Sequence, residues 1–193
     1  NFDDIEKIEI HTSHHTHYVI GTGANDPQKM DPDASRETLD HSIMYIFAVA
    51  LEDGSWHHIN SYTSARAHKK STIRIWQKIK TFEDSEWTKK YHDPDPRKKC
   101  FGGKVIIYFR DGSILEEEKG VADAHPNGLR PFKRSNYIEK FKTLTDGLIT
   151  KTESLKFLKL VQNLKSLKNK DLINLNSEIK SKKFSKNKKK FIF

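Results

Sequence analysis

The sequence predicts an α+β fold: a small, mainly antiparallel sheet with packed helices, followed by helices alone. Strand-like segments and a hairpin signature fall within residues 1–132. Residues 133–178 show only helical periodicity, and residues 179–193 are rich in lysine. Strands that precede a purely helical segment are typical of an α+β unit with a separate helical part. We therefore expect an α+β domain over residues 1–132, helices over residues 133–178 and a disordered tail over residues 179–193.

The first strand and the first helix are predicted by the spacing of apolar residues. Ile8 and Ile10 alternate with a charged residue, which is the pattern of a strand with one buried face. A polar run over residues 11–33, rich in histidine, glycine and aspartate, is expected to be a surface loop. Spacings of three and four then predict one amphipathic helix over residues 39–50. Its apolar residues are Leu39, Ile43, Ile46, Phe47 and Ala50.

Three further elements precede the hairpin. Residues 64–76 carry a weaker helical pattern that ends near Trp76. Residues 79–82 are apolar enough to predict a short strand. Residues 87–97 are polar and contain proline, so we expect a loop there.

The hairpin is the clearest local signal in the chain. The β-rich run 105–109 is followed by Asp111-Gly112, a preferred two-residue turn in which both central positions have positive φ. Residues 113–119 are expected to form the returning strand. A tight loop rich in small residues follows over residues 122–128.

Capping patterns predict the helices of residues 133–178. Asn136 with Glu139, and Thr150 with Glu153, stand three apart, as in a capping box at a helix start. Apolar residues then recur at helical spacing as far as Leu167. If the partner surface of these helices is absent from the chain, the isolated chain should self-associate through them.

Composition limits the classes of protein that the chain can represent. Cys100 is the only cysteine, which excludes an internal disulfide framework and zinc sites built on several cysteines, and points to the cytoplasm. The net charge is +9, but seven lysines lie in residues 179–193, so the rest carries only +2. No segment is apolar enough to span a membrane. Because the chain begins at Asn1 within a strand-like segment, we expect a fragment of a longer protein.

His41 and Tyr45 are the first candidate site residues. They lie four apart on the predicted helix 39–50 and would therefore share a face. A phenol beside an imidazole can donate hydrogen bonds to carboxylates or move protons. The alternative is a half-buried tyrosine that packs under a loop, with His41 on the helix surface.

Two further groups of residues could bind a ligand. The run that holds His11, His14, His15 and His17 offers imidazoles that suit zinc, copper or nickel. No cysteine partners them and the run has the polarity of a loop, so we expect no metal and a solvated or substrate-facing loop. His125, with Arg130 close behind, lies in a turn that could present a donor to an anionic ligand or be a plain turn. The glycines at 21 and 23 lack the third glycine and the βαβ context of a nucleotide site.

Several of these runs together resemble the MmgE/PrpD family, of the type that acts on 2-methylcitrate. The resemblance covers residues 5–148, weakens through the last helices and is absent from the lysine tail. The matching runs are HTSHHTHYVIGTGANDPQK at 11–29, ETLDHSIMYIFAVAL at 37–51, EDSEW at 83–87 with Tyr91 and His92, DAHPNGLRPF at 123–132 and NYIEKF at 136–141.

The resemblance implies a large all-helical domain and a smaller α+β lid domain with the active site between them. The chain would be the lid, followed by C-terminal helices that return to the helical domain. The reaction implied is dehydration of 2-methylcitrate to 2-methylaconitate in propionate breakdown, without any cofactor or iron–sulfur cluster. Tyr45 and His41 would be catalytic. His125, Arg130, His15 and His17 would bind the tricarboxylic acid substrate.

The resemblance also implies partners. The main acid–base residues would lie in an N-terminal helical domain that this chain lacks, so the chain alone should be inactive, and the complete enzyme should be a homodimer. Two other functions stay open: decarboxylation or epimerisation of a related acid on the same scaffold, and a non-enzymatic module whose basic tail binds nucleic acid. We do not expect the nucleic-acid role, because lysine-rich ends are usually only solvating.

Overall fold

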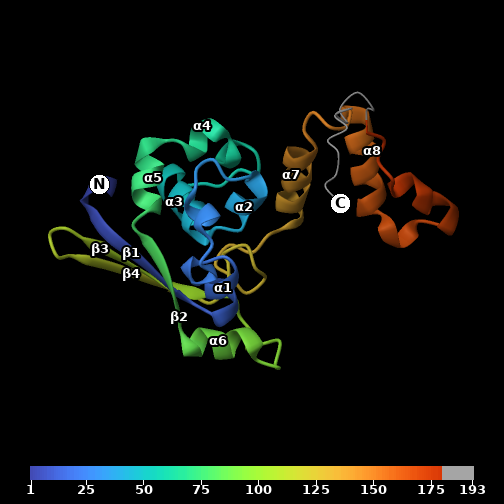
Figure 1. Ribbon diagram of the computed structural model, residues 1–193. Helices are drawn as coiled ribbons and strands as arrows, with labels where there is room; N and C mark the ends of the chain where they lie inside the picture. The colour runs from blue at the N-terminus through green and yellow to red at the C-terminus, as the bar shows by residue number, and fades with distance from the viewer. Residues whose placement is uncertain (180–193) are drawn as a thin grey trace, which may run out of the picture. The chain divides into compact units, whose positions relative to one another are not determined.

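The computed structural model describes residues 1–179, and the chain divides into two compact units (Figure 1). The first unit is Asn1–Arg130, and the second begins at Pro131. The lysines of the predicted tail, from Lys180 on, lie outside the described residues. No helix within the described chain has both the length and the apolar character that crossing a membrane requires.

A four-stranded sheet forms the base of the first unit, and its strand order is β2-β1-β3-β4. The strands are β1 (Ile5–Thr12), β2 (Ile79–Glu83), β3 (Gly103–Phe109) and β4 (Ile114–Lys119). Strand β1 pairs parallel with β2 and antiparallel with β3, and β3 pairs antiparallel with β4. The predicted α+β class with a mainly antiparallel sheet is confirmed.

Short helices gather beside the sheet and enclose the core (Figure 1). Ile8, Val49 and Trp76 come from β1, α3 and α5 respectively, and all three side chains are fully buried. Burying a large apolar side chain contributes about 1.5–3 kcal/mol. The helices are α1 (His14–Val19), α2 (Arg36–Asp40), α3 (Ile43–Asp53), α4 (Ser64–Ala67), α5 (Lys70–Trp76) and α6 (Ser85–His92), with 3-10 turns η1 (Phe2–Asp4), η2 (Thr22–Ala24), η3 (Pro27–Met30) and η4 (Asn60–Tyr62).

The predicted single helix over residues 39–50 is wrong, because the chain breaks at His41-Ser42. His41 is the C-cap of α2, and the Ser42 side chain accepts a hydrogen bond from the backbone N–H of Tyr45 to start α3. Two tertiary hydrogen bonds stabilise the chain at this break. The Ser42 hydroxyl donates to the carbonyl of Lys29 at 2.7 Å, and Lys29 Nζ donates to the carbonyl of His41 at 3.0 Å. His41 and Tyr45 therefore do not share a helix face.

Two segments predicted as loops contain helices, and these predictions are also wrong. Strand β1 continues to Thr12, and Ser13 then caps α1. Asp84 caps α6, so helix extends to His92 in the segment 87–97. Short polar helices of this kind depend on their caps and on packing, which local composition does not show.

Two smaller differences concern the turn and the weaker helix. In the hairpin only Gly112 has positive φ, at 83°. Asp111 instead uses its side chain to accept a hydrogen bond from the N–H of Ser113 at 2.9 Å, which holds the turn with ordinary backbone angles at Asp111. The predicted helix over residues 64–76 is divided into α4 and α5 by a break at His68 and Lys69.

A polar network centred on Glu52 ties α3 to α4 and α5. The Glu52 carboxylate, only 7 % exposed, accepts hydrogen bonds from Arg66 Nη2 at 2.9 Å and from the Thr72 hydroxyl, and Lys69 Nζ lies 2.9 Å away. Burial raises the pKa of this carboxyl, but the hydrogen bonds from Ser71, Thr72 and Lys69 and the charge of Arg66 outweigh it and lower the pKa from 4.5 to about 2. Glu52 is therefore ionised throughout the neutral range.

This network predicts acid sensitivity of the first unit. Because the folded-state pKa of Glu52 is depressed, its contribution to stability is present above pH 4.5 and is lost as the pH falls towards about 2. We expect a loss of roughly 2–3 kcal/mol in the free energy of unfolding across this window. Urea unfolding at several pH values measures it. Glu52→Gln should lack this part of the pH dependence, and parallel curves for both proteins would contradict the assignment.

The second unit contains α7 (Arg134–Thr145) and α8 (Lys151–Gln162), followed by 3-10 turns η5 (Leu164–Ser166) and η6 (Asn169–Leu175). The predicted cap at Thr150 is confirmed, because its hydroxyl accepts from the N–H of Glu153 at 3.1 Å. Asn136 was predicted to be the N-cap of α7, and this prediction is wrong. That position belongs to Lys133, and the Asn136 side chain accepts from its N–H at 2.9 Å. No described residue of this unit is buried.

Candidate functional site

The candidate site lies where the two parallel strands end. Strands β1 and β2 run in the same direction, so their carboxyl ends meet at one edge of the sheet, where α1 and α6 begin. The carboxyl edge of parallel strands is a common place for ligand sites, because chain direction changes there and leaves side chains free. The N–H of His14 donates to the Thr88 hydroxyl at 2.8 Å and joins the two helices.

Three histidines of α1 meet polar and aromatic groups of β2 and α6. Nδ1 of His14 lies 3.1 Å from a carboxylate oxygen of Glu83. Nδ1 of His17 lies 2.7 Å from the hydroxyl of Thr81. The ring of His15 stacks on Tyr91 at a centroid distance of 5.1 Å. We call His14, His15, His17, Thr81, Glu83 and Tyr91 the histidine face.

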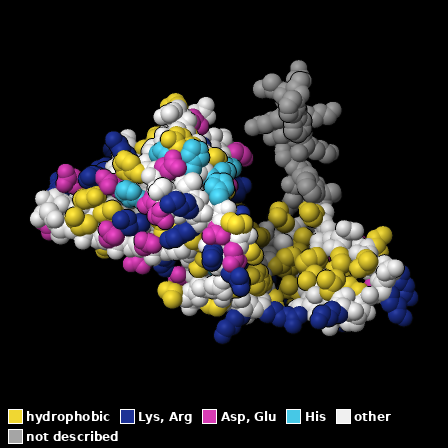
Figure 2. All heavy atoms as spheres, turned by 90° about the horizontal axis from the view of Figure 1, so that it is seen from below, with side chains coloured by type: hydrophobic (Ala, Val, Ile, Leu, Met, Phe, Trp, Pro, Cys, Tyr) yellow, Lys and Arg dark blue, Asp and Glu magenta, His cyan; other side chains and the backbone are white. Residues whose placement is uncertain are grey.

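The pKa values of the histidine face are shifted by burial of its side chains and by hydrogen bonds between them. Burial lowers the pKa of His17, with a smaller opposing effect from the charge of Glu83, so that His17 is neutral near pH 7. The hydrogen bond from His14 lowers the pKa of Glu83, which is therefore ionised. Figure 2 shows histidine side chains among acidic and basic ones on the side of the first unit that it presents.

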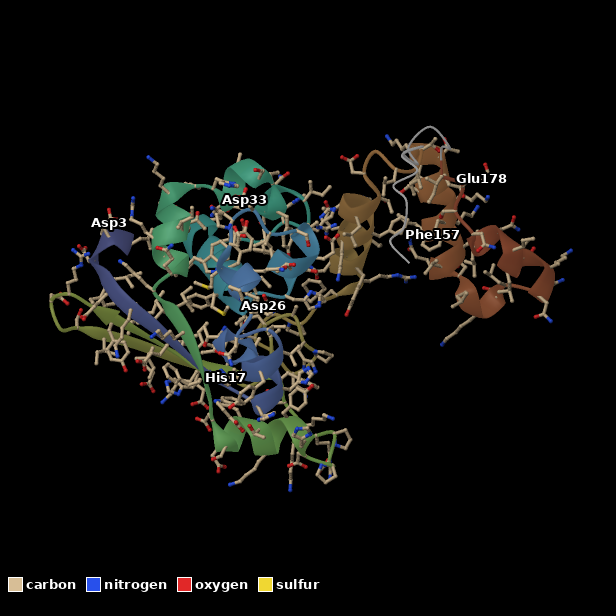
Figure 3. The ribbon with its side chains drawn as sticks, viewed as in Figure 1. Asp3, His17, Asp26, Asp33, Phe157 and Glu178 are labelled. Carbon is tan, nitrogen blue, oxygen red and sulfur yellow. The ribbon has the colours of Figure 1, made fainter. Side chains whose placement is uncertain are left out.

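The turn that holds Gly21, Thr22 and Gly23 packs tightly against this face. Figure 3 labels His17, one of the residues that this turn approaches. The N–H of Thr22 donates to the Thr81 hydroxyl at 2.9 Å. A Cβ on Gly21 would lie 2.4 Å from Oγ1 of Thr81, and one on Gly23 would lie 2.4 Å from Nε2 of His17. Glycine at both positions is what allows the backbone to approach so closely.

Tyr45 and His41 do not lie on the histidine face. Tyr45 is 0 % exposed, its hydroxyl donates to the carbonyl of Ser61 at 2.6 Å, and its ring lies 4.9 Å from that of Trp76. His41 is exposed, and its Nδ1 lies 2.9 Å from the carbonyl of Glu37. Their catalytic roles stay predictions, and the described residues give the Tyr45 hydroxyl a structural partner.

His125 lines an open pocket of about 340 Å³ that adjoins the histidine face. Its Nδ1 accepts a hydrogen bond from the N–H of Asn127 at 3.1 Å. Nη2 of Arg130 forms an ion pair with the Asp123 carboxylate at 2.7 Å. Phe101 lines the same pocket and packs against Tyr91 at 4.9 Å, so the structure connects His125 to His15 through these two rings. The pocket is lined by Pro96, Lys99, Cys100, Phe101, Gly120, Val121, Ala122 and His125.

The sequence predicted the histidines of this face but not their partners. Thr81 and Glu83 stand 64 and 69 residues away from the histidines that they contact, so only the pairing of β1 with β2 shows the connection. The feature of the sequence that could have identified these partners was the presence of polar residues at the end of a predicted strand. Within residues 1–179, no group of three or more histidine, cysteine, aspartate or glutamate side chains is arranged to hold a metal ion.

Comparison with known proteins gives a consistent result. A 2-methylcitrate dehydratase of Salmonella typhimurium is 31 % identical over 144 residues, which are 72 % of this chain and 27 % of that protein. The mitochondrial 2-methylcitrate dehydratase of Yarrowia lipolytica is 25 % identical over 176 residues, 90 % of this chain and 30 % of that protein. A probable 2-methylcitrate dehydratase of Saccharomyces cerevisiae is 30 % identical over 116 residues, which are 60 % of this chain and 20 % of that protein. The chain thus spans less than a third of the length of these relatives.

The family assignment rests on a longer match. Residues 1–166 match the MmgE/PrpD C-terminal domain, and this range contains both helices of the second unit as well as the whole histidine face. The names of the relatives support a lyase-type enzyme family. The chain belongs to the MmgE/PrpD family, and it corresponds to the C-terminal domain of that family.

Proposed function

We propose that this chain is part of a hydro-lyase that dehydrates 2-methylcitrate to 2-methylaconitate. The observation that carries the proposal is the family match over residues 1–166, together with relatives that bear the name 2-methylcitrate dehydratase. In this proposal the histidine face forms one wall of the substrate cleft.

The chemistry of the face suits such a reaction. Loss of water from a hydroxy acid requires an acceptor for the proton next to a carboxylate, an acid that assists the leaving hydroxide, and donors that hold the carboxylates. Imidazoles can fill each of these roles, because a neutral ring carries one donor and one acceptor nitrogen. His15 is exposed beside Tyr91, and His125 is exposed and lines the adjoining pocket.

The proposal includes parts that this chain does not contain. We infer that a helical domain outside these residues supplies the opposite wall of the cleft and further carboxylate-binding groups, and that the complete enzyme is a homodimer. The chain alone should then be inactive. Tyr45 supports the wall from within through its bond to Ser61.

Product analysis of the complete enzyme tests the proposal. With 2-methylcitrate, we expect formation of 2-methylaconitate with loss of water and without release of carbon dioxide. Citrate and cis-aconitate serve as alternative substrates. His15→Ala should lower kcat/KM by roughly tenfold or more, since one positioned acid–base or binding group contributes at least this much. The matched control is His68→Ala, because His68 is exposed and pairs with Asp33, away from the histidine face.

Two results would overturn the proposal. Release of carbon dioxide, or an isomerised acid as the product, would replace dehydration by another reaction of the same family. Equal kcat/KM for His15→Ala and His68→Ala would remove the histidine face from the cleft.

A further inference from the structure

His17 differs from the other histidines of the face because one ring nitrogen is held and the other is free. Its side chain is half-buried, and Nδ1 lies 2.7 Å from the hydroxyl of Thr81. Nε2 has no hydrogen-bond partner among the described residues. Among the described residues, the fully buried side-chain nitrogen or oxygen atoms without a partner are His11 Nε2 and Trp76 Nε1. Nε2 of His17 is not among these fully buried atoms. Nε2 of His17 is therefore without a partner among the described residues and is not fully buried.

The bonds between Thr81 and Thr22 determine which nitrogen carries the proton. The Thr81 hydroxyl accepts from the N–H of Thr22 at 2.9 Å, and the Thr22 hydroxyl accepts from the N–H of Thr81 at 3.1 Å. The two hydroxyl oxygens are 3.0 Å apart, and the Thr22 hydroxyl donates to the Thr81 carbonyl at 3.2 Å.

One proton assignment uses all of these contacts. The Thr81 hydroxyl donates a hydrogen bond to the Thr22 hydroxyl and accepts one from Nδ1–H of His17, which leaves the lone pair on Nε2. In the other tautomer, the Thr81 hydroxyl would donate to Nδ1, and one contact between the two threonines would have no proton. The network therefore favours the Nδ1–H form.

Gly23 packs closely against the ring of His17 beside the free nitrogen. A methyl group at this position would lie 2.4 Å from Nε2 and 2.6 Å from Cδ2 of His17, so any larger residue would displace the ring. The charged or titratable groups that affect the ring are Glu83 of β2 and His14 of its own helix, and burial has a larger effect than either. Together these features keep the ring neutral and oriented, with one nitrogen that has no partner among the described residues.

We infer that Nε2 of His17 accepts a hydrogen bond from the hydroxyl group of the substrate, and that Thr81 is the positioning residue that keeps the lone pair on this atom. This inference rests on the proposed function and deepens it, because it makes the substrate hydroxyl the feature that the face recognises. A site built to bond a hydroxyl discriminates strongly against an analogue that lacks it. The face should therefore select hydroxy acids over acids with the same carboxylates alone.

NMR of the 193-residue chain, with its histidines labelled with ¹⁵N, tests the tautomer directly. We expect the Nδ1–H form for His17 in the wild-type protein and in Thr81→Ser, which retains the hydroxyl. Thr81→Val, which has the same shape without the hydroxyl, should shift the ring towards the Nε2–H form. An Nε2–H form in the wild-type chain would overturn the inference, as would an unchanged tautomer in Thr81→Val.

Ligand discrimination in the complete enzyme tests the role of Nε2. The probes are citrate and tricarballylate, which carry the same three carboxylates and differ by the hydroxyl. We expect citrate to bind about tenfold or more tightly than tricarballylate, and His17→Phe to reduce this ratio to near one. Gly23→Ala, which displaces the ring, should reduce it in the same way. Thr81→Ser should keep the wild-type ratio.

The outcomes separate the inference from the proposed function. If the wild-type enzyme dehydrates 2-methylcitrate but His17→Phe leaves the ratio unchanged, the inference is wrong and the function stands. If the wild-type enzyme binds neither probe and does not act on 2-methylcitrate, the proposed function is wrong. The NMR experiment still decides whether Thr81 controls His17 in that case.

Discussion

Arg66→Met is expected to lower the free energy of unfolding of the first unit by about 3–5 kcal/mol, the usual cost of removing one partner of a buried ion pair. Arg66 is 12 % exposed and bonds both Glu52 and Asp53 at 2.9 Å. Methionine fills a similar volume but leaves the Glu52 carboxylate with one cation fewer in a site that water hardly reaches. Urea unfolding followed by tryptophan fluorescence, to which the buried Trp76 contributes, measures the change.

The matched control is Arg97→Met. Arg97 also pairs with a carboxylate at 2.9 Å, that of Asp95, but its side chain is 88 % exposed. Surface ion pairs contribute about 0–1 kcal/mol, so this variant should unfold almost as the wild type does. Similar losses in Arg66→Met and Arg97→Met would show that the network around Glu52 does not hold the helices together.

Tyr45→Ala is expected to cost about 3–5 kcal/mol, because it opens a cavity among the aromatic rings of the core. Tyr45 is fully buried and contacts Trp76 and Tyr62. Tyr45→Phe retains the ring but leaves the carbonyl of Ser61 without its donor, which costs about 1–3 kcal/mol. Thermal or urea unfolding of both variants measures these losses.

The phenylalanine variant also separates two roles for Tyr45. If its hydroxyl acted on the substrate, Tyr45→Phe would lower kcat of the complete enzyme while its stability stayed near that of the wild type. The structure predicts the reverse: reduced stability, with kcat of the folded enzyme close to the wild-type value. A large loss of kcat without a change in unfolding would instead support the predicted catalytic role of Tyr45.

Much of the fold was predictable from the sequence because it depends on local patterns. Alternation at Ile8 and Ile10 predicted β1, and the Asp-Gly turn predicted the hairpin of β3 and β4. The cap at Thr150 predicted the start of α8. Each of these signals involves residues close together in the chain, where turn and capping chemistry decide the outcome.

The break between α2 and α3 was not predictable in the same way. The apolar spacing continues across it, but the side chains of Lys29 and Ser42 form hydrogen bonds that a continuous helix would not allow. The short helices α1 and α6 were missed for a related reason. Their polar sequences carry little helical preference, and packing between them, such as that of His15 on Tyr91, stabilises both.

The candidate site could be predicted only in part. The histidines of α1 stood out by composition, but their significance depends on Thr81 and Glu83, which the parallel pairing of β1 and β2 places beside them. Conversely, Tyr45 and His41 stood out by spacing, and the break at Ser42 separated them. Local spacing therefore identifies candidate site residues, whereas strand pairing determines which of them are in contact.

Hydrogen exchange of the complete enzyme, with and without bound tricarballylate, tests most directly whether the histidine face lines the substrate cleft. We predict slower exchange on binding in residues 13–23 and 81–92, which carry the face, and no change in β4, the strand at the other edge of the sheet. Protection confined to β4, or no protection of residues 13–23 at saturating ligand, would contradict the proposed site.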